Sequence, residues 1–228
     1  CVSLLLLCAA TIFSKSTTAN ADDRYVKLCE RYFTEFAEDY GKFGQKDGFT
    51  YLYSDKKNTA TIVAIPMEQK KVAVPGKING KTVTKIELMD VFSCSSNYYF
   101  RDEFYGEHED NPVPKVEYLS IPKTVKVINI YAGIGLTEGY CGELQSYLVH
   151  LKKFNVASAN KWYRSYKGML YTKNGKKLLL VPRKYMAKTV KVKKGTTKIA
   201  DFAFSFCTNI KKAVSYTHLR AHETRGNL

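Results

Sequence analysis

The fold of this chain is decided by residues 190–210, which read VKVKKGTTKIADFAFSFCTNI. An alternating apolar segment opens the stretch, a turn containing Gly195 follows, and Ile199 comes seven residues after Val192. Phe204 and Cys207 lie five and eight residues beyond Ile199. Period-2 alternation interrupted by turn residues predicts two short strands with a turn between them.

Two earlier segments share this plan, so the chain carries an internal repeat. Val72-Ala73-Val74-Pro75 leads to Ile86, and Leu119-Ser120-Ile121-Pro122 leads to Ile128. Ile121 and Ile128 are seven residues apart, like Val192 and Ile199. Val74 and Ile86 are twelve apart, because the loop at residues 76–80 is inserted between them.

The cysteines fall into the same register. Cys94 follows Ile86 by eight residues, as Cys207 follows Ile199, and Cys141 begins a Cys-x-x-Leu that matches Cys207-x-x-Ile210. A cysteine that recurs at one repeat position is expected to pack as a small apolar side chain. An even number of cysteines in an exported chain also allows disulfides, so both interpretations stay open. The expected repeat core is Ile86, Cys94, Ile121, Ile128, Cys141, Val192, Ile199, Phe204 and Cys207.

Residues 49–212 resemble the BspA-like leucine-rich repeat family of bacterial surface proteins. The family pattern is roughly V-x-I-P-x-x-V-x-x-I-x-x-x-A-F-x-x-C-x-x-L, and residues 190–210 match it best, although Lys193 replaces the proline. The resemblance implies an α/β repeat solenoid, a strand-rich right-handed superhelix of the leucine-rich-repeat type with β-hairpin insertions. It also implies a non-enzymatic, secreted or cell-surface protein that binds a protein or polysaccharide, as in adhesion.

Two β-hairpins are expected within the repeat region. Residues 49–53 and 59–65 flank a polar turn, and residues 168–172 and 177–182 flank a turn that contains Asn174-Gly175. Asn-Gly is a strong short-range hairpin signal, because both residues tolerate the positive φ angles of a type I′ turn.

The N-terminal region divides into a leader and a cap. Residues 1–21 read as a signal peptide, with an apolar run followed by small residues at Ala19 and Ala21, which places the chain outside the cell or on its surface. Residues 22–48 are expected to form a helical cap, because apolar side chains recur there at three- and four-residue steps from Tyr25 to Tyr40.

Residues 213–228 resemble the read-through translation of a sequencing adapter rather than native protein. His218 and His222 lie there at a spacing that suits zinc on a helix, but the acidic residue that follows the first histidine of a metalloprotease motif is missing. No metal site or cofactor is therefore expected.

The net charge is +15, and residues 22–212 carry 33 basic and 20 acidic side chains. A cationic exported chain is drawn to anionic wall polymers, membrane surfaces or polysaccharide. No nucleic-acid-binding motif stands out, and no transmembrane span is expected in the mature fragment. A solvated lysine-rich face explains the same charge.

The best candidate for a partner contact is the insertion at residues 97–111, because long insertions in repeat proteins often form binding surfaces and this one is rich in aromatic side chains. The contact residues expected there are Tyr98, Tyr99, Phe100, Phe104 and Tyr105. An exposed acidic and aromatic loop without a partner is the alternative.

Little in the sequence indicates catalysis. His150 stands in an apolar stretch, and nothing local brings it to Cys141 as a thiol–imidazole pair. Trp162, Tyr163 and Tyr166 suit either stacking on a sugar ring or packing of the second hairpin. The two other functions that remain are a recognition module of a larger enzyme and a structural cell-envelope protein.

Overall fold

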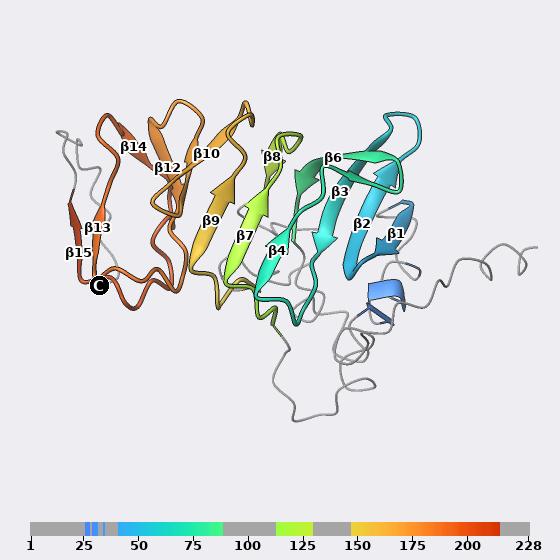
Figure 1. Ribbon diagram of the computed structural model, residues 1–228, viewed down its shortest axis with the longest axis horizontal. Coiled ribbons are helices and arrows are strands. Elements are labelled where there is room, and N and C mark those ends of the chain that lie inside the picture. Colours follow the sequence, from blue (N-terminus) through green and yellow to red (C-terminus); the bar gives the residue numbers. More distant parts are fainter. Residues whose placement is uncertain are drawn as a thin grey trace, which may run out of the picture.

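The computed structural model describes residues 26, 27, 29–31, 34, 41–88, 113–129 and 147–214. These residues form strands joined by turns, with almost no helix (Figure 1). In chain order the strands are β1 (Phe43–Lys46), β2 (Phe49–Ser54), β3 (Thr59–Ala64), β4 (Lys71–Ala73), β5 (Lys77–Ile78), β6 (Lys81–Ile86), β7 (Tyr118–Ile121), β8 (Val127–Ile128), β9 (Lys153–Val156), β10 (Tyr163–Tyr166), β11 (Met169–Thr172), β12 (Lys177–Leu180), β13 (Thr189–Lys191), β14 (Lys198–Ile199) and β15 (Lys212–Val214).

The first expected hairpin is confirmed. β2 and β3 pair antiparallel, with Tyr51 opposite Ile62, and the chain reverses at Asn58, whose φ is 50°. Positive φ is tolerated better by asparagine than by most side chains, which suits it to this turn. β1 adds a third strand next to β2, and β3 pairs on its other side with β6 in parallel.

Strands from successive repeats stack in parallel. β4, β7 and β9 form one ladder in which Val72, Leu119 and Phe154 are register partners, and β6 pairs with β8 so that Ile86 lies beside Ile128 (Figure 1). The equivalences predicted from the repeat, Val72 with Leu119 and Ile86 with Ile128, are therefore confirmed. Parallel pairing places equivalent side chains on one face, so each apolar position packs against its copy in the neighbouring repeat.

The second hairpin is also confirmed, and the sheet around it is larger than expected. β11 and β12 pair antiparallel through the turn at Asn174 and Gly175, where Gly175 has a φ of 70°. β10 pairs with β11 on the other side, and β12 pairs in parallel with β14. β13 pairs in parallel with β15.

One position between the two strands of a repeat is buried in four repeats of the described chain. It lies four residues after Val74, Ile121, Val156 and Val192, and is occupied in turn by Ile78, Val125, Asn160 and Thr196. Asn160 is fully buried, donates from Nδ2 to the carbonyl oxygens of Pro122 (2.8 Å) and Val125 (3.0 Å), and accepts at Oδ1 from the backbone N–H groups of Trp162 and Tyr163 (2.8 Å each). A buried polar group is tolerated when its hydrogen bonds are made, and Asn160 makes four.

The expected repeat core is buried in part. Ile86, Ile121, Ile128 and Val192 are buried, while Phe204 and Cys207 are half-buried and pack against a C-terminal cluster around Tyr171 and Val190. The prediction is wrong for Ile199, which is 37% exposed. Ile86 lies on β6, between β3 and β8, whereas Ile199 lies on β14 at the edge of its sheet, with no described strand beyond it. Cys94 and Cys141 lie outside the described residues.

The expected capping helix is not seen as a complete element. Backbone at residues 26, 27, 29–31 and 34 is helical, and the buried Cys29 belongs to this segment. The apolar spacing predicts a helix that ends near Gly41, and the rest of the expected cap at residues 22–48 contains a strand, because Phe43–Lys46 pair with β2 as β1. Gln45 ties the two segments together by donating from Nε2 to the carbonyl oxygen of Val26 at 2.7 Å.

Residues 1–21, the expected signal peptide, and the aromatic insertion at residues 97–111 lie outside the described residues. So does the adapter-like tail from residue 215 onward, whereas Ala213 and Val214 belong to β15. In the described ranges, no helix is both long and apolar enough to cross a bilayer.

Candidate binding surface

The outer face of the β4–β7–β9 ladder is the best-defined surface for a partner. Side chains alternate between the two faces of these strands. Val72, Leu119 and Phe154 are buried, so the residues immediately before and after each of them point outward. Register aligns them in two rows, Lys71 with Tyr118 and Lys153, and Ala73 with Ser120 and Asn155.

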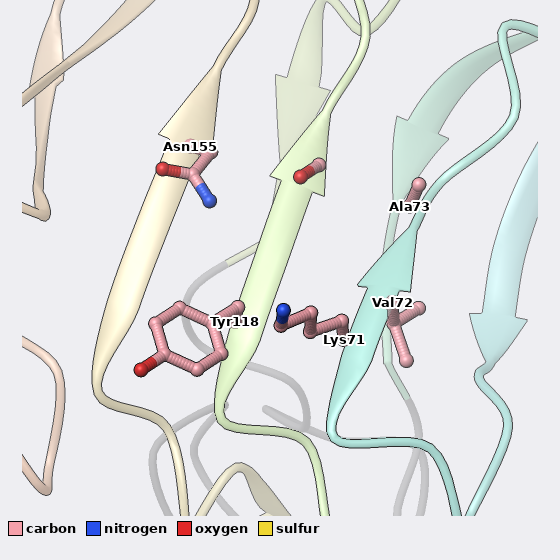
Figure 2. A pocket seen from close by; sticks show the side chains of 6 residues that line it. Lys71, Val72, Ala73, Tyr118 and Asn155 are labelled. Atoms are coloured by element: carbon pink, nitrogen blue, oxygen red, sulfur yellow. The ribbon is translucent and has the colours of Figure 1, made fainter.

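A shallow depression of about 480 Å³ lies on this face, lined by Lys71, Val72, Ala73, Tyr118, Ser120 and Asn155. Figure 2 shows the Lys71 side chain extending from β4 toward β7, with the Tyr118 ring and the Asn155 amide on the same face. Ala73 and Ser120 contribute short side chains to this lining, and Lys71, Tyr118 and Asn155 contribute longer ones.

The chemistry of this face suits binding. It offers an ammonium group, a phenol ring, a hydroxyl and a carboxamide, which together can hydrogen-bond hydroxyl, carbonyl and carboxylate groups and pack against an apolar surface. The register neighbours of Ser120 are Ala73 and Asn155, and neither is a base that could activate its hydroxyl.

The acidic side chains close to this ladder are paired at its lower edge. The Lys152 ammonium lies 2.8 Å from the Glu117 carboxylate, and its hydrogen bond lowers the pKa of Glu117 and raises that of Lys152. Lys115 binds Glu68 at 2.6 Å in the same way. Both pairs are partly exposed and contribute little stability, but they keep these carboxylates engaged away from Lys71.

Of the residues that the sequence singled out for chemistry, the structure describes His150, Trp162, Tyr163 and Tyr166. His150 is exposed in the loop before β9, and Cys141 lies outside the described residues. Tyr163 and Tyr166 are partly buried against the core clusters. Trp162 is 39% exposed, and the Lys126 ammonium lies 5.6 Å from its ring centre, so one ring face is already occupied.

Cys207 behaves as a packed thiol. It forms no disulfide, its Sγ lies 3.6 Å from the carbonyl oxygens of Val181 and Pro182, and burial raises its pKa to about 11. The core interpretation of this cysteine therefore holds. Across the part of the chain that the structure describes, no cluster of His, Cys, Asp and Glu could hold a metal ion.

The sequence analysis missed the outer face of β4, β7 and β9. The signal was present, because Lys71, Ala73, Tyr118, Ser120, Lys153 and Asn155 are the residues that alternate with the repeat-core positions. The aromatic insertion drew the prediction instead, and residues 97–111 are not among those described.

The fold and this surface together define a strand-rich repeat chain with an open, polar, partly aromatic face. No protein-family model matches the sequence, and no curated protein is significantly similar to it.

Solved structures similar to the chain include leucine-rich repeat proteins. A leucine-rich cell surface protein from Faecalibacterium prausnitzii is 16% identical over 78% of this chain and 44% of that one, with a TM-score of 0.39. A leucine-rich repeat protein from Eubacterium ventriosum is 16% identical over 73% and 57%, with a TM-score of 0.36. The pneumococcal vaccine antigen PcpA is 14% identical over 77% and 64%, with a TM-score of 0.35. The chain spans less than two thirds of each of these structures.

Proposed function

We propose that this chain is a leucine-rich-repeat-type solenoid of the BspA-like kind, secreted or held at the cell surface, which binds a protein or polysaccharide through the outer face of β4, β7 and β9. In this proposal each repeat contributes one right-handed coil, made of a strand, a buried turn position and a second strand. The binding is non-enzymatic and serves adhesion.

The observation that carries the proposal is the alignment of outward side chains from three repeats. Lys71, Tyr118 and Lys153 come from segments far apart in the sequence, and parallel register places them in one row beside the depression. The outward positions of this row are equivalent in the three repeats but carry different side chains. The buried positions beside them pack the repeats together, so the outward side chains are available to contact a partner.

A pair of matched double variants tests the proposal. Lys71→Ser with Tyr118→Ser removes an ammonium and an aromatic ring from the depression, whereas Lys126→Ser with Trp162→Ser removes the same groups elsewhere. Binding of each variant to immobilised extracellular-matrix proteins and neutral polysaccharides is compared with that of the unaltered chain. We expect only the first variant to lose binding, and equal binding by all three proteins would refute the assignment.

The positive charge favours a second candidate, a structural envelope protein held by anionic wall polymers. Such binding to purified cell wall falls steeply as salt is added, whereas binding through the depression persists, because hydrogen bonds and packing are screened less than exposed charges. A recognition module of a larger enzyme remains compatible with the same surface.

A further inference from the structure

The positive charge of the chain is concentrated in its C-terminal repeats. Residues 147–214 contain seventeen basic side chains and one acid, Asp201, which gives a net charge of +16 against +15 for the whole chain. The remaining residues are therefore close to neutral. A difference this large between two parts of one chain points to an anionic partner for one of them.

Six of these lysines gather on two adjacent turns, which we call the lysine edge. It consists of residues 173–177, between β11 and β12, and residues 193–198, between β13 and β14, at the top of Figure 1. Its lysines are Lys173, Lys176, Lys177, Lys193, Lys194 and Lys198, and neither range contains Asp or Glu.

Hydrogen bonds hold the two turns side by side. Thr196, fully buried, contacts the carbonyl oxygen of Gly175 from its Oγ1 at 3.2 Å, and the N–H of Thr197 donates to the carbonyl oxygen of Lys176 at 2.8 Å. The Lys193 side chain lies against Gly175, where an added Cβ would meet Cε at 2.9 Å.

Register brings like charges together on the adjoining strands. Lys177 and Lys198 are register partners in β12 and β14, so their backbones run about 4.8 Å apart with both side chains exposed. Like charges at directly opposite strand positions destabilise a sheet, and no described carboxylate pairs with either lysine. Such a placement is unfavourable unless an anion offsets it.

Acids elsewhere in the described chain are placed differently. Glu68, Glu87, Glu117 and Asp55 each bind a lysine at 2.6–2.8 Å. Lysines of the earlier repeats are thus partly neutralised within the fold, whereas those of the lysine edge form no ion pair with a described residue. The edge has the character of a recognition surface for negative charge.

We propose that the lysine edge binds a linear anionic polysaccharide, with the polymer running across the stacked turns from one repeat to the next. Successive turns offer ammonium groups at about the strand spacing, 4.8 Å, so a chain with one negative charge per sugar can contact each turn in sequence. This site is separate from the depression on β4, β7 and β9 and does not depend on the function proposed for it.

The surroundings of the edge favour a polysaccharide over a nucleic acid. Proteins that bind single-stranded nucleic acids stack bases on exposed aromatic rings. Residues 173–177 and 193–198 contain no aromatic side chain. The exposed rings of the described C-terminal repeats, Trp162, Phe202 and Phe206, lie outside the lysine edge, and cations lie near two of them, Lys126 at 5.6 Å from the Trp162 ring centre and Arg183 at 5.0 Å from that of Phe206. Lysine ammonium groups act as point charges and need no planar, two-pronged acceptor, unlike arginine.

The test uses the full chain and two variants of equal charge. One replaces Lys176, Lys177, Lys194 and Lys198 with glutamine, and none of these side chains makes a hydrogen bond within the described structure. The control replaces Lys184, which follows β12, Lys188, which precedes β13, and Lys211 and Lys212 at the start of β15 with glutamine, all outside the two turns of the lysine edge. Binding to polygalacturonate is measured at several salt concentrations, with neutral dextran, duplex DNA and vesicles containing phosphatidylglycerol as further probes.

We expect the lysine-edge variant to bind polygalacturonate roughly tenfold or more weakly, with a shallower dependence on salt, because fewer counterions are released. The control variant should keep the affinity of the unaltered chain. An equal loss in both variants would show that net charge alone attracts the polymer and would overturn the proposal. Tighter binding to DNA or to the vesicles than to polygalacturonate would overturn it as well. The Lys71→Ser, Tyr118→Ser variant should bind polygalacturonate normally, which separates this site from the depression.

Discussion

Replacing Asn160 with alanine removes four hydrogen bonds from a position that water does not reach. The amide links three segments: it donates to the carbonyl oxygens of Pro122 and Val125 in the preceding turn, and it accepts from Trp162 and Tyr163, which lead into β10. Each bond contributes about 1 kcal/mol net to stability, and an unsatisfied buried partner costs about 1–3 kcal/mol. We therefore expect a loss of about 4 kcal/mol, a large part of the roughly 5–15 kcal/mol that holds a typical domain folded.

Urea unfolding followed by tryptophan fluorescence measures this loss directly. Trp162 is the single tryptophan of the chain and lies two residues from Asn160, so its emission reports on the turn itself. The matched control is Asn174→Ala, because Asn174 also accepts a backbone N–H bond, from Lys176 at 3.0 Å, but is exposed. Water can replace the bonds of an exposed amide, so the control should cost less than about 1 kcal/mol.

Two further results bear on the reasoning about Asn160. Asn160→Asp keeps the acceptors but sets a carboxylate against the carbonyl oxygens of Pro122 and Val125, so it should be at least as unstable as the alanine variant. If the free energy of unfolding of Asn160→Ala lies within about 0.5 kcal/mol of that of the unaltered chain, the four hydrogen bonds do not hold the repeats together.

Three other perturbations have defined outcomes. Gly44→Ala should lower the free energy of unfolding by about 1–3 kcal/mol, since the new Cβ would lie 2.5 Å from the Tyr51 hydroxyl. Gly76→Ala is the control and should be tolerated, because its Cβ would meet nothing closer than 3.7 Å. Urea unfolding compares the two variants, and equal stability would contradict the packing argument. Hydrogen bonds from Lys42 and Lys81 lower the pKa of Asp55 to about 2, from an ordinary value of 3.8, so the ion pairs add stability at neutral pH that is lost as pH falls from about 4 toward 2. Asp55→Asn should flatten that acid branch in a pH series of thermal melts, and an unchanged branch would show that other carboxyls control it. Because burial raises the pKa of Cys207 to about 11, iodoacetamide at pH 8 should label this thiol far more slowly in the folded chain than in urea, as followed by peptide mass spectrometry, and rapid labelling of folded protein would mean that the thiol is accessible.

Turn residues and repeat spacing in the sequence predict much of the fold. Asn174-Gly175 predicts the hairpin that the structure contains, although only Gly175 has the positive φ that a type I′ turn requires at both positions. The repeat spacing predicted that Ile86 and Ile128 occupy equivalent places, and the register pairs them. The period-2 pattern does not predict β10, because the side chains of Tyr163–Tyr166 are all half-buried and show no clear alternation.

The residues that make up the two candidate surfaces are harder to predict from the sequence than the strands are, because strand pairing brings them together. Alternation alone marks Lys71, Tyr118 and Asn155 as outward-facing, but the order in which strands pair decides that they surround one depression. The same holds for Lys177 and Lys198, which are far apart in the sequence and become neighbours through the pairing of β12 with β14.

Sequence patterns are sufficient to predict the two hairpins, the paired strands of the repeats and the equivalence of the repeats, because turn chemistry and side-chain alternation act over a few residues. The three-dimensional packing is needed to show that Ile199 is exposed at a sheet edge, that Asn160 is buried with four hydrogen bonds, and that the lysines of two turns form one edge. These properties depend on which segment lies beside which. Burial, desolvation and charge proximity are set by neighbours across the stack, and a linear pattern does not specify them.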